Sequence, residues 1–447
     1  MEPRDRHLGV GISAVTAGTL IAGVIGFVQA LYILRLLGAE HYGTAAVIVA
    51  LGGVAANLVD FRVTDAVARE FYAWQGHPDE RLARARALRV GLLAAVGTGL
   101  TIAAVTLMVG AGWFRLTGAS DGGTSILIWA AASQGIYHVG SYLLYVLRLT
   151  TGWRVLAASQ VLAGATNATV VIAAVVVDPS PVGYIRGMLG ASACNTGFAL
   201  AIAARSWSRA HLRVFSRPDR RIVFRSRWWN LAAAGGALGF SKLLHRSADT
   251  LLVAFFCDER QTGLYRFARS STDALYMLFD ASNKIVQPHL LRLLGGSHVE
   301  EIRRVIARSL AAGALFGIVV IGAEIAFLAS LIAFVGSSYA GAEALVLVLT
   351  LPVVAVLSVH LWLWPMLLHH ERAGEYAVIS LVGVAAIQYA VPSLVVWQLE
   401  IAHALPFAVG YAMVYAWTLL LPVATGWADL RAYLGPRVPA SDAAAVT

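Results

Sequence analysis

Charged residues that could do chemistry interrupt an otherwise apolar stretch of this sequence. The stretch 230–256 carries Lys242, His245, Arg246 and Asp249 near its middle. At about 100° per residue along a helix, Lys242, Arg246 and Asp249 fall within an arc of roughly 60°. His245 lies at the edge of this arc. The spacing predicts a polar stripe along one face of a helix.

A longer stripe of the same kind follows in the next apolar stretch, 261–289. Five charged residues fall within about 60° along it: Arg266, Arg269, Asp273, Asp280 and Lys284. The opposite faces of this stretch stay apolar. A polar stripe is therefore predicted along the whole length of this helix.

Two further apolar stretches carry ionisable residues. At the end of 43–68, Arg62 and Asp65 share one arc with Arg69, the residue that follows this stretch, whereas Asp60 points away from it. Glu324 stands alone near the middle of 305–335. A lone acid in an apolar helix is a candidate for coupling to protons or sodium ions, or else a hydrogen-bonded structural acid.

The three stripes have a chemical consequence, because each ionisable residue at bilayer depth costs about 2.5–3.5 kcal/mol and usually faces a cavity or another charge. We expect a hydrated chamber with a mixed, mainly cationic lining, which suits an anionic substrate such as a diphosphate. The alternative is pairing within each helix at i,i+3 or i,i+4 spacing. The pairs would be Arg246 with Asp249, Arg269 with Asp273, and Asp280 with Lys284.

The composition sets the class of structure that must position these residues. A chain of 447 residues with 58% hydrophobic and 13% charged residues differs from ordinary soluble domains. Its apolar stretches are long enough to cross roughly 30 Å of hydrocarbon as helices. We expect an all-α polytopic membrane protein with about 12 transmembrane helices, the first retained as a signal-anchor. The predicted spans are 11–36, 43–68, 89–113, 124–147, 155–177, 182–204, 230–256, 261–289, 305–335, 340–368, 375–398 and 404–424.

Arginines are distributed unevenly over the predicted loops. With a cytoplasmic N-terminus, the cytoplasmic loops and tails hold 24 arginines and the opposite loops hold four. This bias predicts that both termini are cytoplasmic. The basic patches, part of a net charge of +9, are thus topology signals that can also touch anionic lipid headgroups, and no nucleic-acid partner is expected.

The longest predicted loop divides the chain into two halves of six helices. We expect an N-terminal lobe at 1–204, a basic cytoplasmic linker at 205–229, a C-terminal lobe at 230–424 and a cytoplasmic tail at 425–447. The outer loops are only about four to eleven residues long. This disfavours a membrane enzyme acting on lipid-linked sugars, which generally needs an outer loop or domain.

Cofactor and metal sites have little support in the sequence. Neither lysine, Lys242 or Lys284, lies in a phosphate-binding loop, so coupling to ATP is not expected. The cluster His369-His370-Glu371 is interpreted as a solvated turn, and the two cysteines predict neither a disulfide nor a zinc site. We expect no cofactor and no metal; transport would draw on a sodium or proton gradient.

Several short motifs resemble those of a known family. Leu36-Leu-Gly-Ala-Glu-His-Tyr-Gly43 resembles the LLG-x-E-x-YG signature of oligosaccharide and polysaccharide flippases. That family belongs to the superfamily of multidrug, oligosaccharidyl-lipid and polysaccharide exporters. Further matches are Leu58-Val-Asp-Phe61, Ala68-Arg-Glu70, Ala248-Asp-Thr-Leu-Leu-Val253, Gly263-Leu-Tyr265 with Ala268, and Pro288.

The two halves of the chain also echo each other. A helix, a short outer turn with Gly and Tyr, and a second helix occur at Leu36–Asp60 and again at Phe255–Asp280, as two parallel six-helix repeats would give. The chain departs from the family pattern at Arg62, where glycine is usual after Asp-Phe. This arginine either adds a phosphate-binding charge or marks a divergent substrate.

The resemblance implies a transporter in the bacterial inner membrane that moves an isoprenoid-diphosphate-linked oligosaccharide to the outer leaflet. It also implies two lobes that rock around a central cationic cavity, and possible partners in polysaccharide polymerisation and export. The expected substrate-binding residues are Arg62, Lys242, His245, Arg246, Arg266, Arg269 and Lys284. The expected ion-coupling residues are Asp249, Asp273, Asp280 and Glu324.

Two other functions stay open at this point. The first is a small-molecule or multidrug exporter of the same superfamily, which would be expected to have a smaller, more aromatic and acidic cavity. The second is a membrane-embedded enzyme acting on lipid-linked sugars. A catalytic pair at a membrane surface would favour the enzyme.

Overall fold

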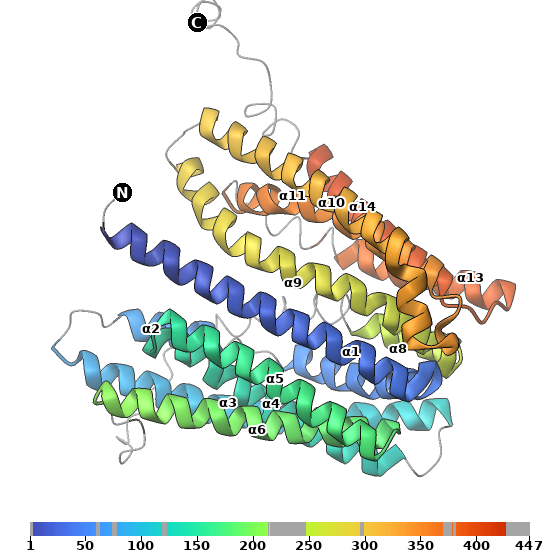
Figure 1. Cartoon of the computed structure of the whole chain (residues 1–447), viewed down its shortest axis with the longest axis horizontal. Helices are drawn as coiled ribbons and strands as arrows, with labels where there is room; N and C mark the ends of the chain where they lie inside the picture. Colours follow the sequence, from blue (N-terminus) through green and yellow to red (C-terminus); the bar gives the residue numbers. More distant parts are fainter. Residues whose placement is uncertain are drawn as a thin grey trace, which may run out of the picture. The chain divides into compact units, whose positions relative to one another are not determined.

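The computed structural model describes residues 3–59, 63–73, 78–118, 123–212, 214, 247–295, 299–369, 378 and 381–425. Every regular element in this part of the chain is helical (Figure 1). The chain divides into two compact units. Unit 1 comprises Met1–Phe267, Ser330–Ala342 and Glu400–Ala404, and unit 2 comprises Ala268–Ala329, Glu343–Leu399 and Leu405–Thr447.

Helices lie in the described part of every predicted span, so the expected all-α polytopic membrane fold is confirmed; residues 230–246 of the seventh span lie outside the described residues. In the described part of the chain, six helices are long and apolar enough to cross a membrane by themselves, and shorter apolar helices accompany them. The helices are α1 Pro3–Leu58, α2 Val63–Ala73, α3 Glu80–Thr117, α4 Gly123–Thr150, α5 Trp153–Val177, α6 Pro181–Arg209, α8 Ala248–Phe256, α9 Glu259–Gly295, α10 Val299–Val335, η1 Ser337–Tyr339, α11 Glu343–His369, η2 Val384–Ala390, α13 Val391–Leu399 and α14 Leu405–Thr425.

Gly38 separates the first two predicted spans within α1. The sequence predicts a gap between residues 36 and 43, but only Gly38 leaves the helical conformation, with φ +71° and ψ 171°. Glycine adopts this left-handed region without the steric penalty that a Cβ atom would impose. A turn of a single residue therefore suffices, and in Figure 1 the blue helix turns back on itself there.

The second predicted span, 43–68, differs from the structure. Its first part forms the end of α1, which stops at Leu58, and its last part belongs to α2, which begins at Val63. The connecting residues 60–62 lie outside the described part of the chain. Continuous hydropathy alone did not reveal that this stretch forms two helices.

Helices α3 and α10 are longer than predicted, with 38 and 37 residues. The predicted spans, 89–113 and 305–335, start only where the apolar residues begin. Each helix starts earlier because its charged first turns are stabilised by pairs along the helix: Arg84 with Glu80, and Arg303 with Glu300 at 3.9 Å. At about 57 Å, α3 exceeds the roughly 30 Å hydrocarbon core.

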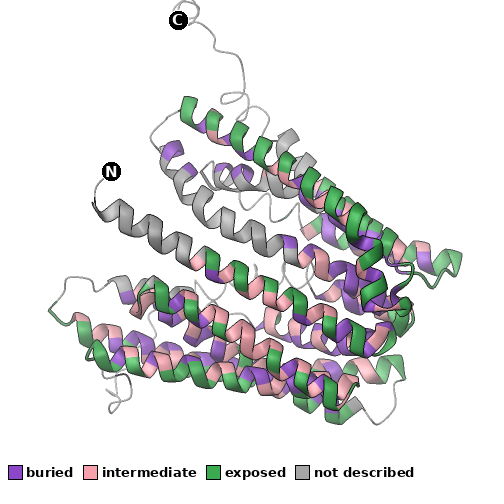
Figure 2. Cartoon of the chain, viewed as in Figure 1, coloured by how far each residue is buried: buried purple, intermediate pink, exposed green. Residues whose placement is uncertain are grey.

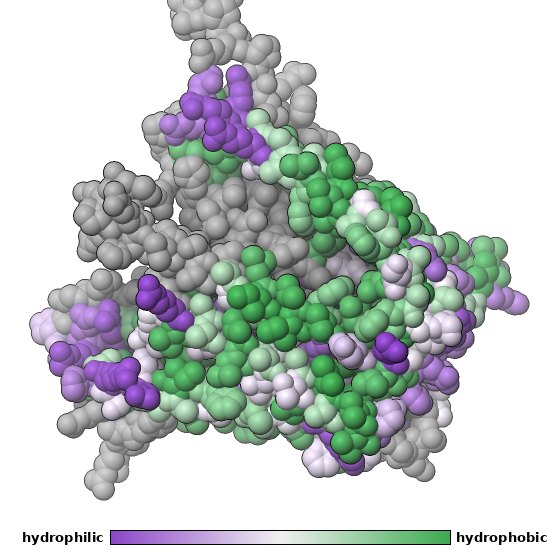
Figure 3. Space-filling model, in the orientation of Figure 1, coloured by the Kyte–Doolittle hydropathy of each residue, from purple (hydrophilic) through white to green (hydrophobic). Residues whose placement is uncertain are grey.

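Apolar side chains cover the outside of unit 1. On α3, Leu93, Leu100 and Met108 are exposed at a spacing that places them on one helix face. Figure 2 shows buried positions between the helices and exposed positions on their outer faces. In Figure 3, apolar side chains gather along the middle of these helices and hydrophilic ones at their ends. Such a face fits contact with lipid tails.

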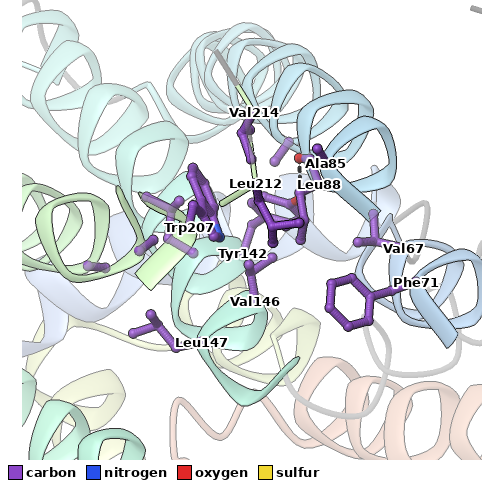
Figure 4. Close-up of a cluster of buried hydrophobic side chains, with 14 of the residues drawn as sticks. Val67, Phe71, Ala85, Leu88, Tyr142, Val146, Leu147, Trp207, Leu212 and Val214 are labelled. Atoms are coloured by element: carbon purple, nitrogen blue, oxygen red, sulfur yellow. Dashed lines mark hydrogen bonds between the residues drawn. The ribbon is translucent and has the colours of Figure 1, made fainter. Parts of the chain in front are cut away.

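Unit 1 has a packed core where α3 begins and where α4 and α6 end (Figure 4). Leu88, Val146 and Trp207 are among its fully buried members. The Tyr142 hydroxyl donates a hydrogen bond of 2.8 Å to the Leu88 carbonyl oxygen, which joins α4 to α3. Both Tyr142 and Leu88 are buried, so this bond fixes the ring within the core.

Unit 2 has its own core, formed where α9 ends, where α10 begins and near the end of α11. Leu290 and Leu294 of α9 pack with Ile302 and Ile306 of α10 and with Trp362 of α11. These side chains are almost fully buried. They hold together the three long helices that carry Arg269, Glu324 and Thr350.

The backbones of α1 and α9 approach closely at two glycines of unit 1. A Cβ atom on Gly43 would collide with the carbonyl oxygen of Glu259, and one on Gly263 would collide with the carbonyl oxygen of Ala39. Each carbonyl belongs to the residue four positions before the opposite glycine, so the contact is reciprocal. We call Ala39, Gly43, Glu259 and Gly263 the glycine crossing. Only glycine permits this approach.

A substitution at the glycine crossing should destabilise the protein. Gly43→Ala adds a methyl group against the α9 backbone and should cost about 1–3 kcal/mol, lowering the Tm of the purified protein by a few degrees. Gly23→Ala is the matched control on the same helix, because nothing lies within 4 Å of a Cβ there. The control should leave the Tm unchanged or raise it slightly. Equal Tm values for the two variants would contradict the close approach.

Candidate functional site

The structure describes the side chains of five predicted site residues: Asp249, Arg266, Arg269, Asp273 and Glu324. Asp280 and Lys284 lie on α9, but their side chains are outside the described set. Four further predicted residues lie wholly outside the described residues: Arg62, Lys242, His245 and Arg246. The candidate site is built from the first five and their neighbours.

Asp249 lies buried at the start of α8 and is held by hydrogen bonds. The Tyr265 hydroxyl of α9 donates to Asp249 Oδ2 at 3.0 Å, and the Thr250 backbone N–H donates to Oδ1 at 2.7 Å. Tyr265 is also buried. A carboxyl group taken out of water needs such donors. Asp249 is thus a buried carboxyl group whose hydrogen bonds are supplied by its neighbours in unit 1.

Close packing against α1 sets the position of α8. A Cβ atom on Gly53 would come within 2.7 Å of Ser247 Oγ. Asn57 Nδ2 donates a hydrogen bond of 3.4 Å to the same oxygen and one of 2.8 Å to the Gly53 carbonyl oxygen. The small residue at position 53 therefore lets the start of α8 lie against α1.

Arg269 is a buried cation in unit 2. Its side chain is 1% exposed, and its guanidinium carbon lies 4.3 Å from the ring centroid of Tyr411 on α14. Tyr411 and Tyr415 share a hydrogen bond of 2.7 Å between their hydroxyls, so both rings are fixed. Cation–π attraction is stronger where both partners are desolvated. Arg269 lies about 15 Å along α9 from its first residue, near the depth of a bilayer midplane.

Arg269 also forms an ion pair along its own helix. Its Nη1 lies 3.3 Å from Asp273 Oδ1, and the Asp273 side chain is 41% exposed. Pairing within a helix, which was the alternative interpretation of the polar stripes, is therefore confirmed for Arg269 and Asp273. The pair runs from a buried cation to a carboxylate that is open at the surface of the unit.

Arg266 lies one turn before Arg269 on the same face of α9 and belongs to unit 1. It lies within electrostatic range of Tyr184, near the start of α6. Among the predicted residues whose side chains are described, Arg269 and Asp273 are the pair that the structure brings together.

Glu324 lies on α10 and faces α11. The Thr350 hydroxyl donates a hydrogen bond of 3.0 Å to Glu324 Oε1. Glu324 Oε2 is also shielded from solvent and has no hydrogen-bond partner among the described residues. Thr350 is fully buried. This arrangement leaves one carboxyl oxygen available for a proton or a cation.

Three residues that contact the predicted site residues were not predicted from the sequence: Tyr265 beside Asp249, Tyr411 beside Arg269 and Thr350 beside Glu324. Tyr265 falls in the Gly-x-Tyr motif, which could have indicated it. Tyr411 and Thr350 come from helices far along the chain, and their apolar surroundings carried no signal. Intrahelical spacing could find Asp273 next to Arg269 but could not find partners on other helices.

In the described part of the chain, no three His, Cys, Asp or Glu side chains lie close enough together to hold a metal ion. Cys257 lies in the turn between α8 and α9. Burial, with a smaller contribution from Asp258, raises the pKa of its thiol to about 12. The thiol therefore stays protonated near neutral pH, where only a thiolate would bind metal strongly.

Aromatic contacts join α1 to the last turn of α10 at the end of unit 1 that holds the glycine crossing. Phe334, from the last turn of α10, lies under the Arg35 guanidinium at 5.0 Å and meets Tyr32 edge-on at 5.9 Å. Arg260 donates a hydrogen bond of 3.4 Å to the Ala340 carbonyl oxygen. Segments from the C-terminal part of the chain thus belong to the same unit as the first helices.

Comparison with solved structures defines the class. A multidrug resistance MATE family transporter of the MOP superfamily, in an inward-facing conformation, matches with TM-score 0.67 and 13% identity over 93% of this chain and 98% of its own. A MATE transporter from Vibrio cholerae matches with TM-score 0.62 and 13% identity, covering 95% and 97%. A MOP superfamily transporter from Pyrococcus furiosus matches with 0.64 and 12%, covering 95% and 96%. The fold is that of the MOP superfamily transporters.

A family model sharpens this class. Residues 8–292 match the model described as polysaccharide biosynthesis protein, and the chain belongs to that family. No curated protein matches the chain. The chain is thus a multi-pass membrane protein of the polysaccharide biosynthesis protein family, with the fold of the transporters compared above.

The contribution of the hydrogen bond between Tyr265 and Asp249 to the stability of unit 1 can be tested directly. Tyr265→Phe removes the hydroxyl and leaves a buried carboxyl oxygen without this donor, at a cost of about 1–3 kcal/mol. The Tm of the purified variant should fall by a few degrees. Tyr137→Phe is the control, because Tyr137 is 62% exposed. A fall of the same size in both variants would show that Tyr265 plays no special part.

Proposed function

We propose that this protein flips an isoprenoid-diphosphate-linked oligosaccharide across the bacterial inner membrane by alternating access. The family membership supports a role in polysaccharide biosynthesis, and the fold supports transport. The single observation that carries the choice of an anionic substrate is Arg269, a cation buried at membrane depth on an aromatic ring.

Arg269 suits a diphosphate for physical reasons. A guanidinium is always charged and offers a planar fork of donors that fits phosphate oxygens. Tyr411 and Asp273 hold it in one orientation, so little side-chain entropy is lost when a substrate binds. Asp273 is the exposed end of this arrangement, where an incoming phosphate would compete with the carboxylate.

The direction of transport follows from the charge bias of the loops. By the positive-inside rule, the arginine-rich loops face the cytoplasm, and the glycine crossing lies at the outer end. The aromatic contacts around Phe334 then lie at the outer end of unit 1. Transport proceeds from the cytoplasmic side to this outer side.

Glu324 is the proposed coupling group. Its unpaired oxygen at membrane depth is stabilised by a proton or a sodium ion, because a bare charge there is costly. Release of that ion would favour a different packing of α10 on α11. Asp249, whose oxygens already accept hydrogen bonds from Tyr265 and Thr250, is the second candidate.

A small-molecule exporter of the same superfamily is the alternative. The transporter from Pyrococcus furiosus is described as having a binding pocket of reverse polarity that suggests a different function, so polarity varies within this fold. The buried cation of this chain favours anionic cargo. The Tyr411 ring would also suit a flat aromatic cation if Arg269 were paired elsewhere.

Depletion of the protein in its host tests the proposed function. Isoprenoid-diphosphate-linked oligosaccharide should accumulate in the inner membrane and stay inaccessible to an impermeant sugar-reactive probe added from outside. Arg269→Gln should reproduce this accumulation at normal membrane expression, and Arg260→Gln, a change at the outer turn, should not. Unchanged lipid-linked sugars together with altered drug sensitivity would support the small-molecule exporter instead.

The coupling role of Glu324 has its own test. Glu324→Gln keeps an oxygen for Thr350 but cannot bind or release a proton. In proteoliposomes the variant should lose the acceleration of transport by an imposed proton or sodium gradient, by about 10-fold or more if coupling supplies at least 1.4 kcal/mol. Glu301→Gln, in the first turn of the same helix, is the control. A gradient response that survives in Glu324→Gln would rule out this residue as the coupling group.

A further inference from the structure

A half-open cavity of about 300 Å³ lies in unit 1, and none of the predicted site residues whose side chains are described lines it. It is bordered by the start of α2, the second half of α4 and the first turns of α5. The lining residues are Val63, Thr64, His138, Ser141, Tyr142, Leu144, Tyr145, Arg148, Leu156 and Gln160. This volume is at the lower limit of typical ligand pockets.

One wall of the cavity is rigid. Tyr142 and Leu156 belong both to the lining and to the packed core of unit 1. Figure 4 shows Tyr142 bonded to Leu88, with the core side chains around it. A Cβ atom on Gly91 would collide with the Tyr142 hydroxyl, so no space remains behind the ring. The ring therefore forms a fixed surface on which a flat or puckered group could rest.

The polar side of the cavity comes mainly from one face of α4. His138, Ser141, Tyr145 and Arg148 follow one another at spacings of three and four residues, so they share this face. The Arg148 guanidinium carbon lies 5.6 Å from the centroid of the Tyr145 ring, which orients the cation. Both ionisable bases of the lining lie on this face, and no acidic residue is among the described residues that line the cavity.

Neutral hydrogen-bonding groups complete the lining. Gln160 Oε1 accepts a hydrogen bond of 3.2 Å from Thr19 of α1, and its amide nitrogen remains as a donor. The Thr64 hydroxyl comes from α2 and the Ser141 hydroxyl from α4. Hydroxyl and amide groups beside aromatic rings and an arginine match a ligand with many hydroxyls and one phosphate. An aliphatic drug would leave these polar groups unpaired, at a cost.

We propose that this cavity binds a sugar phosphate: the phosphate on Arg148, and the sugar ring against Tyr142 and Tyr145. The inference rests on the proposed function, because Arg148 ends α4 on the side that the charge bias assigns to the cytoplasm. The cavity is then a loading site for the first sugar and phosphate of the lipid-linked substrate. Its small volume admits one sugar and excludes a complete oligosaccharide.

Phosphate also occurs in the headgroups of anionic phospholipids, so the test must separate the two sources. The full-length protein in a neutral detergent is titrated by calorimetry with N-acetylglucosamine 1-phosphate, inorganic phosphate and short-chain phosphatidylglycerol. The sugar phosphate should bind at least 10-fold more tightly than either of the other two probes. Equal or tighter binding of phosphatidylglycerol would overturn it in favour of a lipid site. Equal binding of inorganic phosphate would remove the sugar from the proposal.

Three variants connect the binding to the cavity. Arg148→Gln should weaken sugar-phosphate binding about 10-fold or more, because a charge-assisted contact is lost. Ser141→Phe should fill the cavity and abolish binding without a fall in Tm. Arg154→Gln, an exposed arginine of the same cytoplasmic turn, should bind within twofold of wild type. Unchanged binding in both cavity variants would overturn the proposal.

These outcomes are independent of the flippase assay. Normal sugar-phosphate binding with no accumulation of lipid-linked oligosaccharide on depletion would refute the proposed function but leave the cavity as a sugar-phosphate site. Accumulation on depletion with no sugar-phosphate binding would support the proposed function and refute the cavity as a sugar-phosphate site.

Discussion

The contact between α1 and α9 at Gly43 and Gly263 is the constraint on which the rest of unit 1 depends. Two helix backbones touch there without side chains between them, and each glycine rests on a carbonyl of the other helix. The contact fixes the start of α9, which places Tyr265 two residues later on Asp249. The same helix then continues to Arg269 in unit 2. A motif that resembles a family signature thus has a mechanical role.

The described ionisable groups inside the membrane have neighbours that offset part of the cost of burying a charge. Asp249 accepts hydrogen bonds from Tyr265 and Thr250, and Arg269 lies on the Tyr411 ring beside Asp273. In Glu324, Thr350 donates to one carboxyl oxygen, and the other oxygen has no hydrogen-bond partner among the described residues. A carboxyl group with one oxygen in that state suits a change of protonation or ion occupancy.

The fold could be predicted from the sequence because apolar length and arginine bias are local properties. The break near Gly38, the helical spans and the pairing of Arg269 with Asp273 all follow from spacing along the chain. The tyrosine under Arg269, the threonine beside Glu324 and the cavity next to Arg148 could not be predicted, because they depend on which helices become neighbours. Four predicted cationic or histidine residues, from Arg62 to Arg246, lie outside the described residues and stay predictions, as do the lobe boundaries.

Transport in a purified system tests the central claim most directly. Lipid-linked oligosaccharide extracted from depleted cells would be reconstituted with the protein in liposomes, and its movement between leaflets followed with an impermeant glycosidase. Wild-type protein should expose the whole pool to the glycosidase, whereas Arg269→Gln should expose only the outer half. Equal exposure by both proteins, or exposure of half the pool by wild type, would contradict a flippase that works through the buried arginine.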